Sequence, residues 1–551
     1  AALALTGGLF LAYDMLGSVS DYPFSQGWSE GNRLYESSLY FIPERYVVSG
    51  EFEGTRRSIG RFLLWGLPFL VNDAPIWLHR LWNALLSFVP HLLLGLALAR
   101  RTRLDRLGRW IFAAWVMLFL NQGPIYTPLI ISALLVVLFA RPGWRPARLL
   151  TGAAALAAAG YFASLSRWTW LPAVPVLTVI LLLDEPAGPA ADAPGAPGRD
   201  APARPTPEPG ALEPGVPPAR PGLRLLGFDL AWLLNVALLA LAALLGGMLA
   251  NPKLLQPERL SKSTALAQPL LWYRLFPSAT YPEGVLPALL LAVGPLLALL
   301  AWLAFSRRWR PTWLHALACL AGGVLLLGGG LVASVKIGGG NNLHNLDLLL
   351  VMLVFVAAVA LGRAGAHPPG AWPRPLQALL ALLLFLPAWG VVRSAGALDL
   401  PRPGAVRKAL ETLQSETQAA AQTGEVLFID QRQLLTFGYL SGIPLVSKYE
   451  KKYMMDQAMA GDADYFAGFY HDLASRRFSL IVSDKQFTQQ KDSGYAFGEE
   501  NNAWVKWVSE PLLCYYAPIE TLYAVDIQLL APLENPTGCP IDAPANPADA
   551  P

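Results

Sequence analysis

The sequence predicts a polytopic α-helical membrane protein with about eleven spans, followed by one C-terminal α/β domain outside the cytoplasm. Hydrophobic residues make up 54% of the 551 residues and charged residues only 15%, and the mean hydropathy is +0.39. A soluble chain of this length needs more charge to cover its surface. The apolar residues gather into long stretches, and arginines gather between alternate stretches.

The apolar stretches define a transmembrane domain over 1–392. A span needs about 20 apolar residues, or fewer where neighbouring helices shield it from lipid. The chain begins inside the first stretch, which we interpret as a truncated span rather than a cleaved signal peptide. The predicted spans are 1–13, 76–99, 110–122, 125–140, 149–164, 170–183, 224–250, 286–306, 311–335, 346–362 and 375–392.

The arginines predict the orientation, because short loops rich in Arg and Lys stay in the cytoplasm. Every second loop is basic, so these loops and the N-terminus are predicted to be cytoplasmic. The long first loop (14–75), the segment 336–345 and the tail (393–551) then share the outer side of the cell (inner) membrane. The basic loops are 100–109, 141–148, 307–310 and 363–374.

Two segments differ in composition from the spans. Residues 184–223 are rich in Pro, Ala and Gly and cannot bury a core, which predicts a disordered cytoplasmic linker. In the tail, 426–430 and 478–484 read as buried strands on either side of a helical segment, 447–475. This pattern predicts an extracytoplasmic soluble α/β domain over 393–551, through which a protein partner could dock.

The cysteines leave two alternatives for the tail. Cys514 and Cys539 either pair, if the compartment is oxidising, or remain two free thiols. A disulfide would close a loop of about 25 residues and stabilise the domain by about 3 kcal/mol. No CxxC or Cys/His spacing predicts a metal site, and no basic patch with interleaved aromatics predicts binding to nucleic acid.

The first loop carries the candidate catalytic acids. Asp21 and Glu30 follow the first span closely, with Tyr and Trp residues between and beside them. A carboxylate in a cleft at the membrane face can take a proton from a sugar hydroxyl, and aromatic rings can stack on pyranose faces. The alternative is that the aromatics form an interfacial belt and that the acids are solvated.

A glycine turn before a late span is the candidate phosphate site. Three glycines let backbone N–H groups converge, and the following helix N-terminus and Lys336 add positive potential. The alternative is an ordinary Gly-rich turn whose Asn345 or Asp347 caps the next helix. Arg274, in the loop before the eighth span, would add charge for a lipid phosphate or would contact lipid headgroups. The candidate ligands in the turn are Lys336, Gly338, Gly339, Gly340, Asn341, Asn342 and His344.

Two motifs resemble the membrane-embedded GT-C fold glycosyltransferases, which include the RgtA/B/C/D-like, aminoarabinose-transferase-like and protein-mannosyltransferase-like families. The segment 29–35 (Ser-Glu-Gly-Asn-Arg-Leu-Tyr) looks like the Asp-Glu-x-x-Tyr segment of their first loop, with Ser29 in place of the first acid. The segment 336–342 looks like the Lys-x-Gly-Gly-x-x-Asn stretch of RgtA-like members. The order of first span, long acidic loop, further spans and soluble tail also matches.

The resemblance implies transfer of a sugar from a polyprenyl-phosphate donor to a glycan, lipid or protein acceptor on the outer face, with inversion. Glu30 or Asp21 would be the base, and Arg33 and Tyr35 would contact substrate. No Asp-x-Asp motif stands in the first loop, which favours the metal-independent branch, without a cofactor. The alternative is a non-catalytic accessory subunit of a larger envelope or bioenergetic assembly, docking through its tail.

Overall fold

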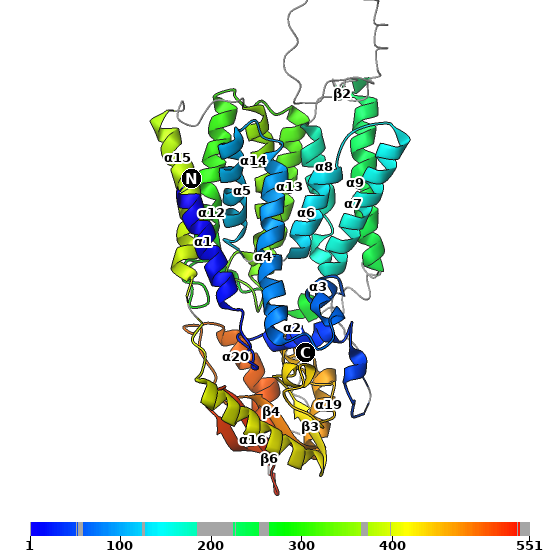
Figure 1. Ribbon diagram of the computed structural model, residues 1–551, viewed down its shortest axis with the longest axis vertical. Coiled ribbons are helices and arrows are strands. Elements are labelled where there is room, and N and C mark those ends of the chain that lie inside the picture. Colours follow the sequence, from blue (N-terminus) through cyan, green and yellow to red (C-terminus); the bar gives the residue numbers. More distant parts are fainter. Residues whose placement is uncertain are drawn as a thin grey trace, which may run out of the picture.

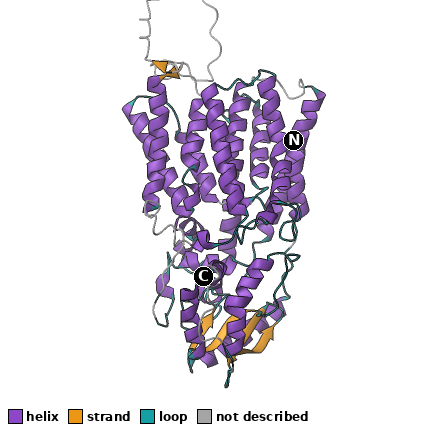
Figure 2. Ribbon diagram, turned by 180° about the vertical axis from the view of Figure 1, so that it is seen from behind, coloured by secondary structure: helices purple, strands orange, loops and turns teal. Residues whose placement is uncertain are grey.

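The computed structural model describes residues 2–50, 52, 59–123, 127–184, 224–225, 228–252, 264–364, 373–396, 398–536 and 538–539. A bundle of long helices forms one half of the molecule, and the C-terminal α/β domain lies at one end of it (Figures 1 and 2). The predicted linker 184–223 lies outside the described residues except for Asp184.

A helix lies at each predicted span among the described residues. The apolar faces of all of these helices except α1 form one continuous core, whose most buried helix is α14, and α1 packs in a smaller cluster with α5 and α15. The bundle helices are α1 (Ala2–Gly17), α4 (Ile76–Ala99), α5 (Arg106–Leu120), α6 (Thr127–Phe139), α7 (Pro146–Ser166), α8 (Ala173–Leu183), α9 (Leu230–Ala250), α12 (Val285–Phe305), α13 (Trp313–Ser334), α14 (Asp347–Arg363) and α15 (Arg374–Ser394).

The predicted number of eleven spans is wrong. Among the described residues, seven helices are long and apolar enough to cross a membrane: α4, α7, α9, α12, α13, α14 with the turn before it, and α15. The helices α1, α5, α6 and α8 have only 16, 15, 13 and 11 residues. A helix rises about 1.5 Å per residue, so these four are shorter than the hydrocarbon layer and pack beside the longer ones.

The first loop folds into short helices beneath the bundle. They are α2 (Glu30–Ser38), a 3₁₀ turn η1 (Pro43–Arg45), α3 (Ile59–Trp65) and a second 3₁₀ turn η2 (Leu67–Leu70). The alternation of arginines and apolar residues in 56–75 predicts one amphipathic helix in the membrane interface. Its described residues form two short pieces instead, because Gly66 and Pro68 end the regular hydrogen bonding after Trp65. Both α2 and α3 lie between the bundle and the C-terminal domain (Figure 1).

The tail is an α/β domain, as its pattern predicts. Its sheet has the strand order β3-β4-β6-β5, in which β3 and β4 are parallel and the other pairs antiparallel. Helices α17 to α19 form the crossover between β3 and β4, as a parallel pair requires. The elements are α16 (Pro403–Ala421), β3 (Glu425–Phe428), α17 (Gln433–Thr436), α18 (Lys451–Ala460), α19 (Ala463–Ala474), β4 (Phe478–Asp484), α20 (Gly498–Trp504), a π-helical turn η9 (Val505–Ser509), α21 (Glu510–Tyr515), β5 (Tyr516–Leu522) and β6 (Ile527–Pro532).

Shorter elements join these parts. The bundle loops contain β1 (Arg224–Leu225), β2 (Phe228–Asp229), α11 (Thr264–Ala267), and the 3₁₀ turns η3 (Trp168–Trp170), η6 (Trp272–Leu275) and η7 (His344–Leu346). Leu270 pairs with Lys336 in an isolated antiparallel bridge, which joins the loop before α12 to the glycine turn.

The structure contains the disulfide between Cys514 and Cys539, with a Cα–Cα distance of 5.5 Å. It ties α21 to the segment after β6. Replacing both cysteines with alanine should therefore lower the free energy of unfolding of the tail by about 3 kcal/mol. Urea unfolding of the full chain, followed by protease cleavage within the tail, measures this. Adding a reductant should destabilise the native chain to the same extent and leave the double variant unchanged. Equal stability of the two oxidised proteins would contradict the prediction.

Candidate functional site

The first loop, the glycine turn and the C-terminal domain meet at one end of the bundle. The backbone N–H of Ser25 donates to Oε1 of Gln431 at 3.1 Å, which joins the first loop to the segment after β3. The N–H of Gly338 donates to Oε1 of Glu500 at the start of α20. The first loop and the glycine turn, which carry most of the predicted site residues, thus both contact the C-terminal domain at this end of the bundle.

Arg80, one turn into α4, organises the first loop around its guanidinium group. Its Nε and Nη2 donate to the two carboxylate oxygens of Glu30 at 2.9 and 3.0 Å. The remaining N–H groups donate to the backbone carbonyls of Ser20, Tyr22 and Phe24 at 2.7, 2.6 and 3.1 Å. Because Arg80 is only 2% exposed, it needs all of these acceptors, and the loop 20–30 must wrap around it.

Glu30 is consequently bound by three donors. Besides Arg80, the backbone N–H of Gln26 donates to Oε2 at 2.7 Å. A carboxylate that accepts a bidentate arginine has fewer lone pairs with which to take a proton from a substrate. This geometry fits a positioning role for Glu30 in holding the loop better than the predicted role as general base.

Asp21 lies on the exposed side of the same loop. Among the described residues, its carboxylate accepts no hydrogen bond and forms no ion pair, while its backbone carbonyl faces the hydroxyl of Tyr439 at 3.5 Å. Burial, followed by the charge of Asp21, raises the pKa of the Tyr439 phenol, and Arg80 opposes this change. Of the two predicted acids, Asp21 has the carboxylate open to a proton donor.

Arg33 and Tyr35, on α2, have different surroundings. The guanidinium of Arg33 lies 5.5 Å from the ring centre of Trp65, and that of Arg61 lies 5.4 Å from the same ring. Two cations thus share one aromatic ring beneath the bundle. Tyr35 is only 3% exposed, and the guanidinium of Arg432 lies 5.0 Å from its ring centre. Tyr35 belongs to the core between the first loop and the C-terminal domain, which fits a packing role better than the predicted substrate contact.

Arg274 is fully buried in an ion-pair cluster with the C-terminal domain. Its Nη1 and Nη2 donate to the two carboxylate oxygens of Glu500, each at 2.9 Å. Nη2 also donates to Glu499 at 3.0 Å, and Nη1 donates to the carbonyl of Gly339 at 2.7 Å. Because its guanidinium is occupied by these acceptors, the geometry fits a structural role for Arg274 better than the predicted phosphate contact. We call Arg274, Glu499 and Glu500 the clamp.

The glycine turn binds an anion, but the chain itself supplies that anion. The N–H of Gly338 points to the Glu500 carboxylate, and the N–H of Gly339 closes the turn onto the Lys336 carbonyl at 2.9 Å. Gly338 and Gly340 have φ of +80° and +73°, and a Cβ on Gly340 would lie 2.9 Å from Cβ of Arg274. The glycines are thus needed for the clamp, and the N–H of Gly338 donates to Glu500 in place of the predicted substrate phosphate.

The polar residues around the turn extend the site toward the bundle. Lys336 is half-buried, and this burial lowers the pKa of its ammonium group. Asn342 accepts from the backbone N–H of His344 at 2.8 Å, and its Oδ1 lies 2.5 Å from Nδ1 of the His344 ring. The Oδ1 atom of Asn341 is buried without a hydrogen-bond partner among the described residues. An unpaired buried acceptor in this turn is a place for a donor group of a ligand.

Helix α18 of the C-terminal domain lies near both the first loop and the glycine turn. At its start, the Lys451 ammonium lies 5.3 Å from the ring centre of Trp28 in the first loop. Toward its end, Cε of Met459 lies 3.8 Å from where a Cβ on Gly338 would be. Lys451 and Met459 are eight positions apart on α18. At about 1.5 Å per residue, the contacts with the first loop and with the glycine turn therefore lie roughly 12 Å apart along the helix axis.

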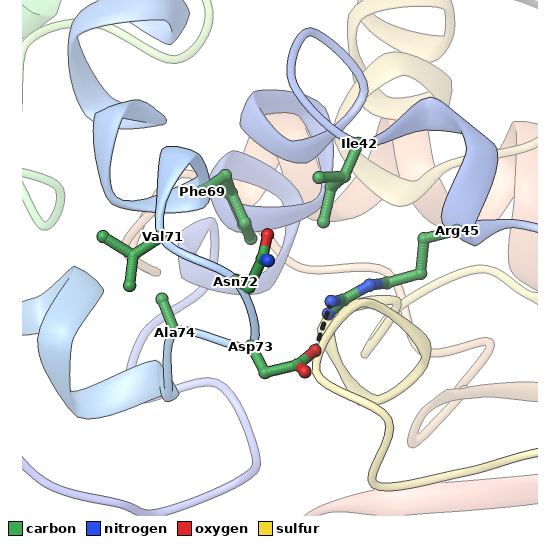
Figure 3. A pocket seen from close by; sticks show the side chains of 7 residues that line it. All are labelled: Ile42, Arg45, Phe69, Val71, Asn72, Asp73 and Ala74. Atoms are coloured by element: carbon green, nitrogen blue, oxygen red, sulfur yellow. Dashed lines mark hydrogen bonds and ion pairs between the residues drawn. The ribbon is translucent and has the colours of Figure 1, made fainter.

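The cavity drawn in Figure 3 lies in another part of the first loop. It has a volume of about 130 Å³, and in it the guanidinium of Arg45 points toward the carboxylate of Asp73, 2.8 Å away. None of the predicted site residues lines this cavity. Among the described residues, no group of three or more His, Cys, Asp or Glu side chains is placed to hold a metal ion.

The clamp should weaken in acid. Hydrogen bonds from Tyr273 and Arg274 outweigh the effect of burial and hold the pKa of Glu499 below its ordinary value of 4.5. Its stabilising contribution is therefore complete above that ordinary value and is lost as the pH falls through the lower pKa of the folded state. Hydrogen exchange in 498–504, corrected for the intrinsic rate, should accelerate over this range. In Glu499→Gln the acceleration should be smaller, and equal pH dependence in both proteins would contradict the prediction.

The sequence analysis missed Arg80, Glu499 and Glu500. Arg80 lies inside an apolar predicted span, where an ionisable residue usually has a charged partner or a function, so its position in the sequence could have identified it. The two glutamates lie in a polar stretch of the tail, and no local pattern points to Arg274, their partner 225 and 226 residues away. No protein-family model matches this chain, and no curated protein matches its sequence.

Proposed function

We propose that this protein is a membrane-embedded glycosyltransferase of the GT-C type, which moves a sugar from a polyprenyl-phosphate donor to an acceptor hydroxyl. One observation carries the proposal. The first loop, which carries Asp21 and Arg33, and the glycine turn, which begins at Lys336, both contact the C-terminal domain at one end of an apolar helical bundle. A lipid-linked donor enters such a place from the bilayer, and an acceptor enters from water.

In the proposed reaction, Asp21 takes the proton of the acceptor hydroxyl as its oxygen attacks the anomeric carbon. The bond between that carbon and the phosphate oxygen breaks, and polyprenyl phosphate leaves with the electron pair, so the configuration inverts. Arg33 and Lys336 supply positive charge for the leaving phosphate. Glu30, held by Arg80, positions the loop that carries Asp21.

The basic loops support an orientation for this site. The loops rich in arginine lie at the end of the bundle away from the C-terminal domain, as α5, which begins at Arg106, illustrates. By the rule for positive residues, that end faces the cytoplasm. The C-terminal domain and the site then face the outer side of the inner membrane.

The test is transfer by the purified full chain in liposomes. Polyprenyl-phosphate donors carrying radiolabelled hexoses or pentoses are mixed with an extract of cell-envelope glycans and lipids, with EDTA present. We expect the label to leave at least one donor and to enter an acceptor with inverted anomeric configuration. If every donor stays intact under these conditions, the proposal of a metal-independent transferase is wrong.

A second candidate, a non-catalytic accessory subunit, is favoured by one observation. Both the Arg80–Glu30 pair and the clamp join parts of the protein to each other and leave those charges satisfied. An accessory subunit would be inert with all donors and would copurify, through residues 393–551, with a defined membrane complex after mild solubilisation. A transferase would show turnover without that complex.

A further inference from the structure

Trp28 is a half-exposed aromatic residue of the first loop, next to the C-terminal domain. It precedes Glu30 by two residues, and its side chain is 50% exposed. The ammonium group of Lys451 lies 5.3 Å from the ring centre. Because a cation over the face of an indole is attracted by the ring's negative quadrupole, Lys451 holds the orientation of this ring.

Lys451 is itself fixed by two carboxylates. It is 5% exposed, and its Nζ lies 3.1 Å from Oδ2 of Asp430 and 3.0 Å from Oδ2 of Asp484. Burial alone would lower the pKa of the ammonium group, but the charges of Asp430 and Asp484 outweigh burial and raise it. The lysine therefore remains a cation beneath Trp28 and cannot move away without breaking two ion pairs.

Asp484 leaves part of its carboxylate open to solvent. The side chain of Asp430 is only 6% exposed, whereas that of Asp484 is 31% exposed. Besides its ion pair with Lys451 and a hydrogen bond with its own backbone N–H, the Asp484 carboxylate has one further contact among the described residues, a long one of 3.5 Å from the Gln486 amide to Oδ1. Asp484 can therefore accept hydrogen bonds from a ligand close to the same ammonium group that touches the Trp28 ring.

The position in the fold also favours ligand binding. Asp430 follows β3 by two residues and Asp484 ends β4, and these two strands are the parallel pair of the sheet. In α/β sheets, ligands bind at the crevice outside the carboxyl ends of parallel strands. Here that edge faces the first loop, which contributes Trp28.

We infer that Trp28, Lys451 and Asp484 form a subsite for a pyranose ring of the acceptor, made jointly by the first loop and the C-terminal domain. A pyranose has an apolar face of C–H groups that packs on an aromatic ring and equatorial hydroxyls that donate to a carboxylate. Trp28 supplies the flat face, Asp484 accepts from the hydroxyls, and Lys451 positions both. This inference rests on the proposed function, to which it adds that the acceptor is a glycan.

Saturation-transfer NMR tests the subsite without any donor. The full chain is solubilised in a detergent without a sugar headgroup, and the probes are the methyl glycosides of glucose, galactose and mannose. We expect saturation of the protein to reach the ring protons of at least one probe. Trp28→Ala should weaken its binding roughly 2- to 10-fold, and Trp28→Phe, which keeps an aromatic face, should restore most of it.

The control is Trp168→Ala, since Trp168 is 41% exposed and lies in another loop. This variant should bind the probe as the native chain does. Binding that is absent from the native chain, or unchanged in Trp28→Ala, would overturn the inference. A chain that binds a pyranoside through Trp28 but transfers no sugar would instead overturn the proposed function and leave the subsite standing.

Discussion

Replacing Asp21 with asparagine should lower the rate of sugar transfer about 10²- to 10⁴-fold, which is the usual contribution of a general base. The amide has nearly the same shape but cannot take the proton of the acceptor hydroxyl. Because the Asp21 side chain is exposed and forms no ion pair among the described residues, the thermal stability should not change. Initial rates with saturating donor in liposomes, together with a melting curve, measure both quantities.

Glu44→Gln is the matched control for this variant. Glu44 is also an exposed acid of the first loop, and its replacement should leave the transfer rate within about twofold of the native value. Glu30→Gln then separates the two predicted acids. If Asp21→Asn is fully active, Asp21 is not the base, and a folded but inactive Glu30→Gln then leaves Glu30 as the acid of this loop that the reaction needs. If both variants keep full activity, the assignment of a carboxylate base to this loop is contradicted.

Replacing Arg80 with methionine should destabilise the first loop by about 3–5 kcal/mol, because it removes one partner of a buried ion pair. The carboxylate of Glu30 would remain, only 13% exposed, without its bidentate partner. The carbonyls of Ser20, Tyr22 and Phe24 would lose their donors as well. Hydrogen exchange across 20–38 should accelerate by two to four orders of magnitude, since each 1.4 kcal/mol corresponds to about a factor of ten.

Two further variants show whether this effect arises from the specific pairing. Arg33→Met removes a cation of the same loop that has a cation–π contact with Trp65, and it should cost about 1 kcal/mol or less. The double variant Arg80→Met/Glu30→Met should recover part of the loss, because it leaves no unpaired charge buried. Protection of 20–38 that is unchanged in Arg80→Met would show that the loop does not depend on this residue.

The positions of the bundle helices could be predicted from local composition. A stretch such as 313–334 is apolar along its whole length, so a helix there follows from its own residues whatever its neighbours are. The two strands at 425–428 and 478–484 were also visible as apolar β-branched runs between polar segments. The number of membrane crossings was overestimated because composition does not give the length of each helix, as α6 with 13 residues illustrates.

The candidate site was predictable only in part. The alternation of basic loops predicted that the loops with Asp21, Glu30, Lys336 and the glycines lie on the same side of the membrane. The structure brings these loops to one end of the bundle. The sequence did not reveal that Glu30 pairs with Arg80, or that Arg274 and Gly338 share the carboxylate of Glu500. Charged residues such as Glu30 and Arg274 were predicted to act on the substrate because the sequence does not show the internal partner of each.

The sequence alone determined what depends on neighbouring residues: the apolar helices, the basic loops at one end, and the change to an α/β pattern in the tail. Only the tertiary structure decided which charges meet. The ion pairs Arg80–Glu30 and Arg274–Glu500 join residues 50 and 226 positions apart in the sequence. Because a buried charge without a partner is strongly destabilising, each buried arginine must meet its carboxylate in the folded protein. Hydropathy is a property of a segment, whereas an ion pair is a property of two segments that the fold has brought together.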